Sequence, residues 1–227
     1  MGGRKLNIKC KDNNVKKGYM RTHKRARFLI IIVLFSIIIA LIGLISHYYA
    51  FPKKDFINAN GIPKTFFIDS NNRIDIQPNN YECAAFSSAY VLRNLGVEAE
   101  GSELYKTYPC KLYDGTVSPK GITTFFEKYG YNAVFYKGDI NTLKKQISCG
   151  VPVIAFIKVF LNKSYLHFVP IVGYDEEYLY LADSLKCTIN CNMKSYNRKI
   201  SIKDFKDLWR TGIPFYKNTY IVVRKCL

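Results

Sequence analysis

Four polar residues of this chain have the types and the order of a nucleophilic acyl-transfer site. Gln77 lies six residues before Cys83, His167 is the only imidazole after residue 47, and Asp183 follows His167 by sixteen residues. A thiol at the start of a helix favours the thiolate form, and a His beside it can carry the proton. An acid can orient that His, and an amide can bind an oxyanion. The four residues therefore predict cysteine-nucleophile chemistry.

Each of these residues also has a purely structural interpretation. A single cysteine is commonly a small buried hydrophobic residue, a His on an apolar strand is often a satisfied core residue, and a Gln near a turn has no meaning alone. Trp209 is interpreted as a core residue rather than a platform for substrate. The combination of Gln77, Cys83, His167 and Asp183, with its spacing, favours catalysis.

A predicted β-hairpin brings the His and the acid together. Residues 166–172 and 178–182 have strand character, and a three-residue turn centred on Asp175 places His167 directly opposite Asp183. Opposed residues share a face of the sheet and lie ~5 Å apart. A shift of one residue would send the two side chains to opposite faces. In this register Asp175 lies at the turn tip, so Asp183 is predicted as the acid.

The remaining elements must hold these residues in place. Periodicity and Gly punctuation predict helices over 83–92 (ended by Gly96), 121–129 (ended by Gly130), 141–147 (capped by Asn141) and 202–209; further strands are expected over 132–136, 151–159 and 220–224. Helices that precede strands favour an α+β fold with an antiparallel sheet.

The amino terminus predicts a membrane anchor. Residues 1–27 carry ten Lys or Arg and one acid, and residues 28–46 contain an apolar run of eighteen uncharged residues, about the length that crosses a bilayer. A cleaved signal peptide is the alternative, but the run is long and lacks a good small-residue cleavage site. The positive-inside rule places residues 1–27 in the cytoplasm. Residues 47–62 are predicted as a juxtamembrane stalk and 63–227 as an extracytoplasmic domain.

Charge indicates the partners that the chain is expected to have. The amino-terminal tail accounts for +9 of the net charge of +17, and the remaining positive charge is interspersed with acids. A basic tail beside an apolar span is typical of membrane topology, so no nucleic-acid partner is predicted. The expected partners are the lipid bilayer, through residues 28–46, and a peptide or protein substrate.

The other cysteines predict neither a metal nor a defined disulfide set. Cys187 and Cys191 could close a short loop, but an odd number of further cysteines leaves at least one free if Cys83 is free. Zinc is disfavoured because the domain supplies only His47 and His167 as imidazoles. No cofactor is predicted. The five further cysteines are Cys110, Cys149, Cys187, Cys191 and Cys226.

These motifs resemble the bacteriocin-processing, double-glycine-leader peptidase family of papain-like cysteine peptidases. The resemblance rests on Gln77, on Glu82-Cys83-Ala84-Ala85, on His167-Phe168-Val169 and on Asp183. It implies a papain-like fold with amino-terminal helices packed on an antiparallel sheet. It also implies Cys83 as nucleophile, His167 as general base and acid, Asp183 as the orienting residue and Gln77 as oxyanion donor.

Two features differ from the family pattern. Ser184 stands where many members have Pro after the Asp, and well-known members work in the cytoplasm, whereas this domain is predicted outside it. We therefore expect a single-pass, membrane-anchored cysteine peptidase. The alternatives are an acyltransferase or transglutaminase-like enzyme with the same triad, and a catalytically silent binding or immunity module on the same fold.

Overall fold

The computed structural model describes residues 7–68 and 72–225. The chain divides into two compact units, Met1–His47 and Tyr48–Leu227. The first six residues of the predicted basic tail lie outside the described residues.

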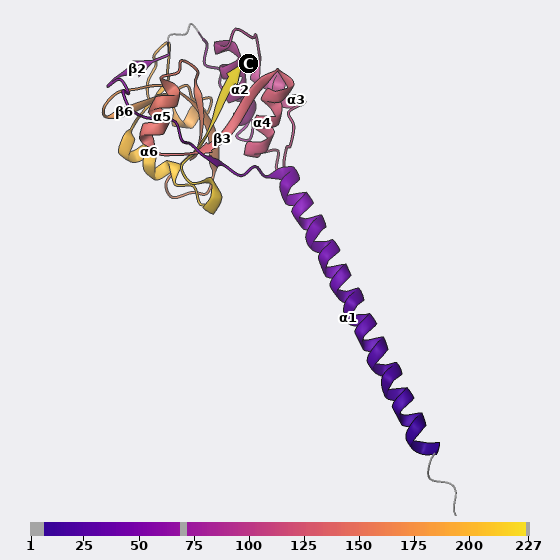
Figure 1. Ribbon diagram of the computed structural model, residues 1–227. Coiled ribbons are helices and arrows are strands. Elements are labelled where there is room, and N and C mark those ends of the chain that lie inside the picture. The colour runs from indigo at the N-terminus through magenta and orange to yellow at the C-terminus, as the bar shows by residue number, and fades with distance from the viewer. Residues whose placement is uncertain (1–6, 69–71, 226–227) are drawn as a thin grey trace, which may run out of the picture. The chain divides into compact units, whose positions relative to one another are not determined.

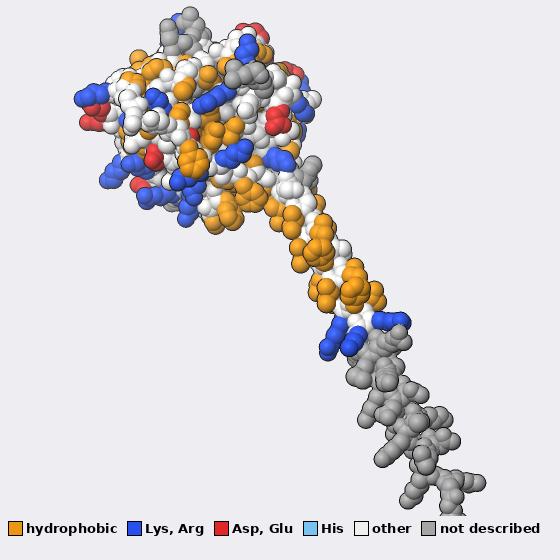
Figure 2. All heavy atoms as spheres, in the orientation of Figure 1, with side chains coloured by type: hydrophobic (Ala, Val, Ile, Leu, Met, Phe, Trp, Pro, Cys, Tyr) orange, Lys and Arg blue, Asp and Glu red, His pale blue; other side chains and the backbone are white. Residues whose placement is uncertain are grey.

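The first unit contains one long helix, α1 (Asn7–Tyr48). Its segment Arg27–Ser46 has 20 residues, a mean hydropathy of 3.4 and no buried part, so it is long and apolar enough to cross a membrane. Figure 2 shows hydrophobic side chains around this segment, with Lys and Arg side chains next to its amino-terminal end. The finding agrees with the predicted span in length and composition.

The second unit is a mixed sheet covered by helices on both faces (Figure 1). The strand order is β1-β3-β8-β4-β5-β6-β7, and β2 pairs with one end of β5. All pairs are antiparallel except the two-residue pair β1–β3 at the edge. The helices are α2 (Cys83–Asn94), α3 (Gly101–Lys106), α4 (Pro119–Lys128), α5 (Ile140–Ile147) and α6 (Ile202–Trp209), and the strands are β1 (Lys53–Lys54), β2 (Phe66–Phe67), β3 (Tyr131–Lys137), β4 (Val153–Lys158), β5 (Leu166–Tyr174), β6 (Tyr178–Leu181), β7 (Arg198–Ser201) and β8 (Thr219–Lys225).

Two hydrophobic clusters pack on the two faces of the sheet. The cluster with α2 and α4 includes Leu92, Phe126 and Phe168, whereas the cluster with α5 and α6 includes Leu143 and Trp209. Alternation along β5 sends Phe168 to the first cluster and Val169 and Ile171 to the second. The predicted α+β class is confirmed, with His167 at the start of β5 and Cys83 at the start of α2.

Most predicted elements are present, with shifted ends. The helix predicted from Asn141 begins at Ile140 instead, because Asp139 caps it: the Asp139 carboxylate accepts from the Thr142 N–H at 2.8 Å, and the Thr142 hydroxyl accepts from the Asp139 N–H at 2.9 Å. Four of the helices and strands in the described residues were not predicted: α3, β7 and the two-residue strands β1 and β2.

The predicted hairpin register is wrong. Tyr174 pairs with Leu179, and Ile171 pairs with Leu181 rather than with Leu179. The turn is tighter than predicted, because the Asp175 carboxylate accepts from the N–H groups of Glu177 and Tyr178 at 2.8 and 2.6 Å. A bulge between Ile171 and Gly173 then shifts the register by one residue.

The bulge determines the face on which Asp183 falls. If the pairing at the turn continued unbroken, His167 would face position 186, and Asp183 would point to the other face. With the shift, an extended β6 would set position 185 opposite His167, and position 183 would keep the face of His167. Strand β6 ends at Leu181, two residues before Asp183. The predicted pairing therefore failed in register but was right about the shared face.

Part of the segment predicted as a stalk is ordered against the sheet. Strand β1 pairs with the end of β3. The buried Asp55 carboxylate accepts hydrogen bonds from the Tyr220 hydroxyl at 2.6 Å and from the Gln146 amide at 2.7 Å. These contacts attach residues 53–55 to the folded unit.

Candidate active site

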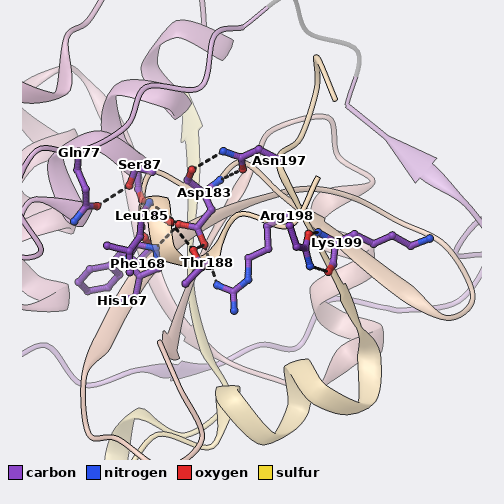
Figure 3. Close-up of polar contacts among 12 residues, drawn as sticks. Gln77, Ser87, His167, Phe168, Asp183, Leu185, Thr188, Asn197, Arg198 and Lys199 are labelled. Carbon is purple, nitrogen blue, oxygen red and sulfur yellow. Dashed lines mark hydrogen bonds and ion pairs between the residues drawn. The ribbon is translucent and has the colours of Figure 1, made fainter. Parts of the chain in front are cut away.

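Cys83 is the first residue of α2 and is 7% exposed. Helix α2 packs against β5, and the Ser87 hydroxyl donates to the carbonyl of Phe168 at 2.9 Å (Figure 3). This bond joins the first turn after Cys83 to the residue that follows His167. The thiol and the imidazole are therefore positioned by α2 and β5, which pack against each other and are hydrogen-bonded.

His167 and Asp183 form a buried pair. The Nε2 atom of His167 lies 2.8 Å from Oδ1 of Asp183, and the two side chains are 1% and 0% exposed. The bond to Asp183 occupies Nε2, which leaves Nδ1 as the ring nitrogen for the thiol. The sequence-predicted His and acid are brought together.

The Asp183 carboxylate accepts from four donors. Oδ1 accepts from His167 and from the Leu185 N–H at 2.9 Å, whereas Oδ2 accepts from the Thr188 hydroxyl at 2.7 Å and from Nη1 of Arg198 at 2.9 Å. Figure 3 shows these groups converging on the carboxylate. Charge-assisted bonds of this kind fix both the position and the ionised form of a carboxylate.

The shared bonds move the pKa values of the pair apart. Burial alone lowers the pKa of His167, but the charge and hydrogen bond of Asp183, together with the neighbouring Cys83, raise it to about 10. Burial raises the pKa of Asp183, but His167, Arg198 and the Leu185 N–H outweigh burial and hold it well below its usual value. His167 is therefore protonated and Asp183 ionised at neutral pH.

Gln77 is hydrogen-bonded to Ser184, the residue that follows Asp183. Its side-chain oxygen accepts from the Ser184 hydroxyl at 2.7 Å, its Nε2 donates to the Asn79 carbonyl at 2.7 Å, and its backbone N–H donates to the Ser184 carbonyl at 2.9 Å. Gln77 is 6% exposed. The amide plane is thus fixed at both ends, and Gln77 is attached to the residue that follows Asp183.

Several residues that hold the site escaped the sequence analysis. The Asn197 amide brackets the main chain of Asp183: its oxygen accepts from the Asp183 N–H at 2.7 Å and its nitrogen donates to the Asp183 carbonyl at 2.8 Å. Arg198 follows it and bonds the carboxylate. No local motif marks Thr188, Asn197 or Arg198. The positions of Asn197 and Arg198 depend on the pairing of β7 with β6.

Five cysteines of the folded unit are free thiols: Cys83, Cys110, Cys149, Cys187 and Cys191. Cys226 lies outside the described residues. Over residues 7–68 and 72–225, no group of three or more His, Cys, Asp or Glu side chains is placed to hold a metal ion.

Comparison with known proteins identifies the family. A model of the peptidase C39 family matches residues 71–219, about two thirds of the chain. A search of curated proteins gave no match. The matched residues 71–219 include Gln77, Cys83, His167 and Asp183. The chain belongs to the peptidase C39 family and is a cysteine peptidase.

Solved structures support the fold. The peptidase domain of Streptococcus ComA, a bifunctional ABC transporter, has a TM-score of 0.54 and 16% identity over 68% of this chain and 99% of that chain. A C39-like peptidase from Bacillus anthracis has a TM-score of 0.57 and 17% identity over 73% and 100%. The Carica candamarcensis cysteine protease CMS1MS2 has a TM-score of 0.50 and 14% identity over 73% and 100%. The fold is papain-like, as predicted.

Proposed function

We propose that Cys83 is the nucleophile of this peptidase and that His167, Asp183 and Gln77 complete its catalytic set. The buried His167 ring carries the proposal, because it joins the acid through Nε2 and has Cys83 as its other neighbour. Protonated His167 stabilises a thiolate on Cys83, and the first turn of α2 adds its positive dipole end. The thiolate attacks the peptide carbonyl, and His167 then gives its proton to the leaving amine.

Two N–H groups are proposed as the oxyanion hole. Cys83 is the first residue of α2, so its backbone N–H has no acceptor within the helix. The Gln77 amide nitrogen carries two hydrogens, of which the Asn79 carbonyl takes one. The other hydrogen is proposed to bind the oxyanion together with the Cys83 N–H. Water then releases the acyl group with neutral His167 as base.

We further propose that the enzyme is anchored in the cell membrane and works outside the cytoplasm. The 20-residue segment Arg27–Ser46 supports the span, and the basic residues before it support a cytoplasmic amino terminus. The proposed divisions are a tail over 1–27, a span over 28–46, a connecting segment over 47–62 and a peptidase domain over 63–227. The substrate is proposed to be an extracytoplasmic peptide or protein.

The test is peptide cleavage by single variants of the full chain. Cys83→Ser and His167→Ala should each abolish cleavage of a peptide library followed by mass spectrometry. Cys149→Ser is the matched control, because Cys149 is an exposed thiol in the same unit, and its activity should equal wild type. Peptide cleavage by either site variant at the wild-type rate would end the proposal.

The same assay distinguishes hydrolysis from transfer. A transglutaminase-like enzyme would use the same triad and pass the acyl group to an amine. With a primary amine added, hydrolysis predicts free carboxyl products, whereas transfer predicts amide products with the mass of the added amine. Amide products as the main species would assign the enzyme to acyl transfer.

A further inference from the structure

Arg198 is a buried cation at the site for which the proposed reaction has no step. It is 6% exposed and lies at the start of β7, opposite Leu181, the last residue of β6. Its Nη1 atom lies 2.9 Å from Oδ2 of Asp183, whereas His167 bonds Oδ1 (Figure 3). A buried guanidinium is costly unless its charge is paired, so its position against this carboxylate calls for a physical role.

The charges at the site alternate in sign. On the proposed function, four charged groups follow one another: the thiolate of Cys83 on α2, the imidazolium of His167 on β5, the carboxylate of Asp183 after β6 and the guanidinium of Arg198 on β7. His167 and Asp183 are almost fully buried, so water screens this array little. With Arg198 the array is neutral; without it, one negative charge would be left in excess.

The two cations beside Asp183 differ in one respect. On the proposed function, His167 is charged while Cys83 is a thiolate and becomes neutral once its proton has left with the amine. Arg198 stays charged at every stage, because guanidinium does not lose its proton in proteins. The Asp183 carboxylate therefore keeps one cationic partner through both halves of the reaction.

We propose that Arg198 is a positioning residue that keeps Asp183 ionised throughout turnover and so sets the pH range in which the His167–Asp183 pair works. This inference rests on the proposed function of Cys83 and His167. The side-chain contact that places Arg198 at the site is its bond to the Asp183 carboxylate, so it acts through that group. Asn197, the preceding residue, fixes the Asp183 main chain, so two consecutive residues of one segment hold both the backbone and the side chain of the acid.

The role predicts a direction for the pH profile. A nearby cation makes proton uptake by the His167–Asp183 pair less favourable. Removing the cation therefore favours protonation of the pair at each stage of the reaction. Deacylation needs the unprotonated pair, so the acid limb of kcat should move to higher pH. Attack needs the protonated pair, so the alkaline limb of kcat/KM should also move to higher pH. For charges in a partly buried site, a shift of about one pH unit is expected.

The experiment compares three variants of the full chain. Arg198→Gln keeps a hydrogen-bond donor for Oδ2 but removes the charge, and both limbs should move up by about one unit. Arg198→Lys keeps the charge, and both limbs should stay at the wild-type positions. Lys199→Met removes the charge of the next residue, which is exposed, and should leave both limbs unchanged.

Each outcome decides between a charge role and a simple structural one. Slower turnover of Arg198→Gln with unmoved limbs, or an equal shift in Lys199→Met, would overturn the proposal. If Arg198→Gln gives no folded protein, the Lys variant decides: retained limbs support the charge role, and shifted limbs overturn it. Cys83→Ser and His167→Ala are assayed first. Activity in those variants would overturn the proposed function itself, whereas their inactivity with unmoved limbs in Arg198→Gln overturns only the role of Arg198.

Discussion

Ser184 and Gln77 are 107 residues apart in sequence and are joined by two hydrogen bonds. The Ser184 hydroxyl donates to the Gln77 side-chain oxygen at 2.7 Å, and the Gln77 N–H donates to the Ser184 carbonyl at 2.9 Å. Ser184 follows Asp183 directly. The acid bonded to His167 and the proposed oxyanion donor are therefore linked through one residue, Ser184.

The first prediction concerns this pair. Gln77→Ala should lower kcat by ~10²–10³, the typical loss for one oxyanion donor, with little change in substrate affinity. Ser184→Ala releases one end of the Gln77 side-chain amide and should lower kcat by about tenfold, which is less than the loss of the whole donor. In a Gln77→Ala background, Ser184→Ala should add nothing, because it acts through Gln77. Steady-state kinetics of the four proteins measure this cycle.

Two controls separate a lost contact from a damaged site. Alkylation of Cys83 by iodoacetamide should stay fast in every variant, because the thiolate depends on His167 and not on Gln77. Ser118→Ala changes another buried serine, whose hydroxyl has no partner in the described chain, and should leave kcat unchanged. A wild-type kcat in Gln77→Ala would remove Gln77 from the mechanism.

The second prediction is a pH shift for Asp183→Asn. The Asp183 charge and hydrogen bond raise the pKa of His167 to about 10, so kcat/KM of the wild type should fall only as pH rises toward that value. Asparagine can still orient the ring but carries no charge, so the alkaline limb should move down toward the ordinary His pKa of ~6.5, with some activity kept below it. The measurement is kcat/KM from pH 5 to 11.

Asp175→Asn is the matched control for that shift. Asp175 is the other acid of the same hairpin, but it caps the turn and bonds the Tyr180 hydroxyl at 2.6 Å rather than His167. Its substitution should affect stability and leave the alkaline limb in place. An alkaline limb that moves in Asp175→Asn and not in Asp183→Asn would contradict the assignment of the acid.

The sequence predicted which residues lie close together better than the geometry that joins them. Residue type and order were enough to pair His167 with Asp183, which are hydrogen-bonded, while the catalytic roles of Cys83, His167 and Asp183 stay predictions. The amphipathic pattern likewise predicted α6 over its observed range. The hairpin register depended on an Asp175-capped turn and a bulge whose effects on side-chain parity cancel. Alternation of residues does not reveal such a cancellation.

The supporting residues could not be predicted for a different reason. Asn197 and Arg198 acquire their roles only when β7 pairs with β6. The bond from Thr188 to Asp183 depends on the conformation of the segment after Leu181. A buried Arg has the same sequence signature as an exposed one. Ser184 was noted as a departure from the family, but its bond to Gln77 needed the three-dimensional structure.

The third prediction tests the bulge. Gly173 lies just after it and pairs with Phe67 of β2; a Cβ added there would lie 2.6 Å from the Phe67 ring and 2.9 Å from the Phe66 carbonyl oxygen. Gly173→Ala should therefore cost about 1–3 kcal/mol by overpacking. In a domain of this size each kcal/mol lowers Tm by roughly 2–4 °C, which calorimetry can measure.

Gly212→Ala is the control for Gly173→Ala. An added Cβ at Gly212 meets nothing within 4 Å, so Tm should change little. If the bulge sets the face of Asp183, Gly173→Ala should also lower kcat/KM at temperatures where the domain remains folded. Equal Tm values for the two Gly variants would contradict the close packing of β2 on β5.

The last prediction concerns topology, and single-cysteine variants test it. Cys149 is exposed on the folded unit, whereas Cys10 lies in the basic tail that the positive-inside rule assigns to the cytoplasm. In whole cells, a membrane-impermeant maleimide should label a chain that keeps only Cys149 and should not label one that keeps only Cys10. After lysis both chains should be labelled, which confirms that each thiol is reactive. The reverse pattern, with Cys10 labelled from outside and Cys149 only after lysis, would place the peptidase in the cytoplasm. Labelling of Cys149 in the medium rather than in the membrane fraction would instead indicate that the apolar segment is removed as a signal peptide.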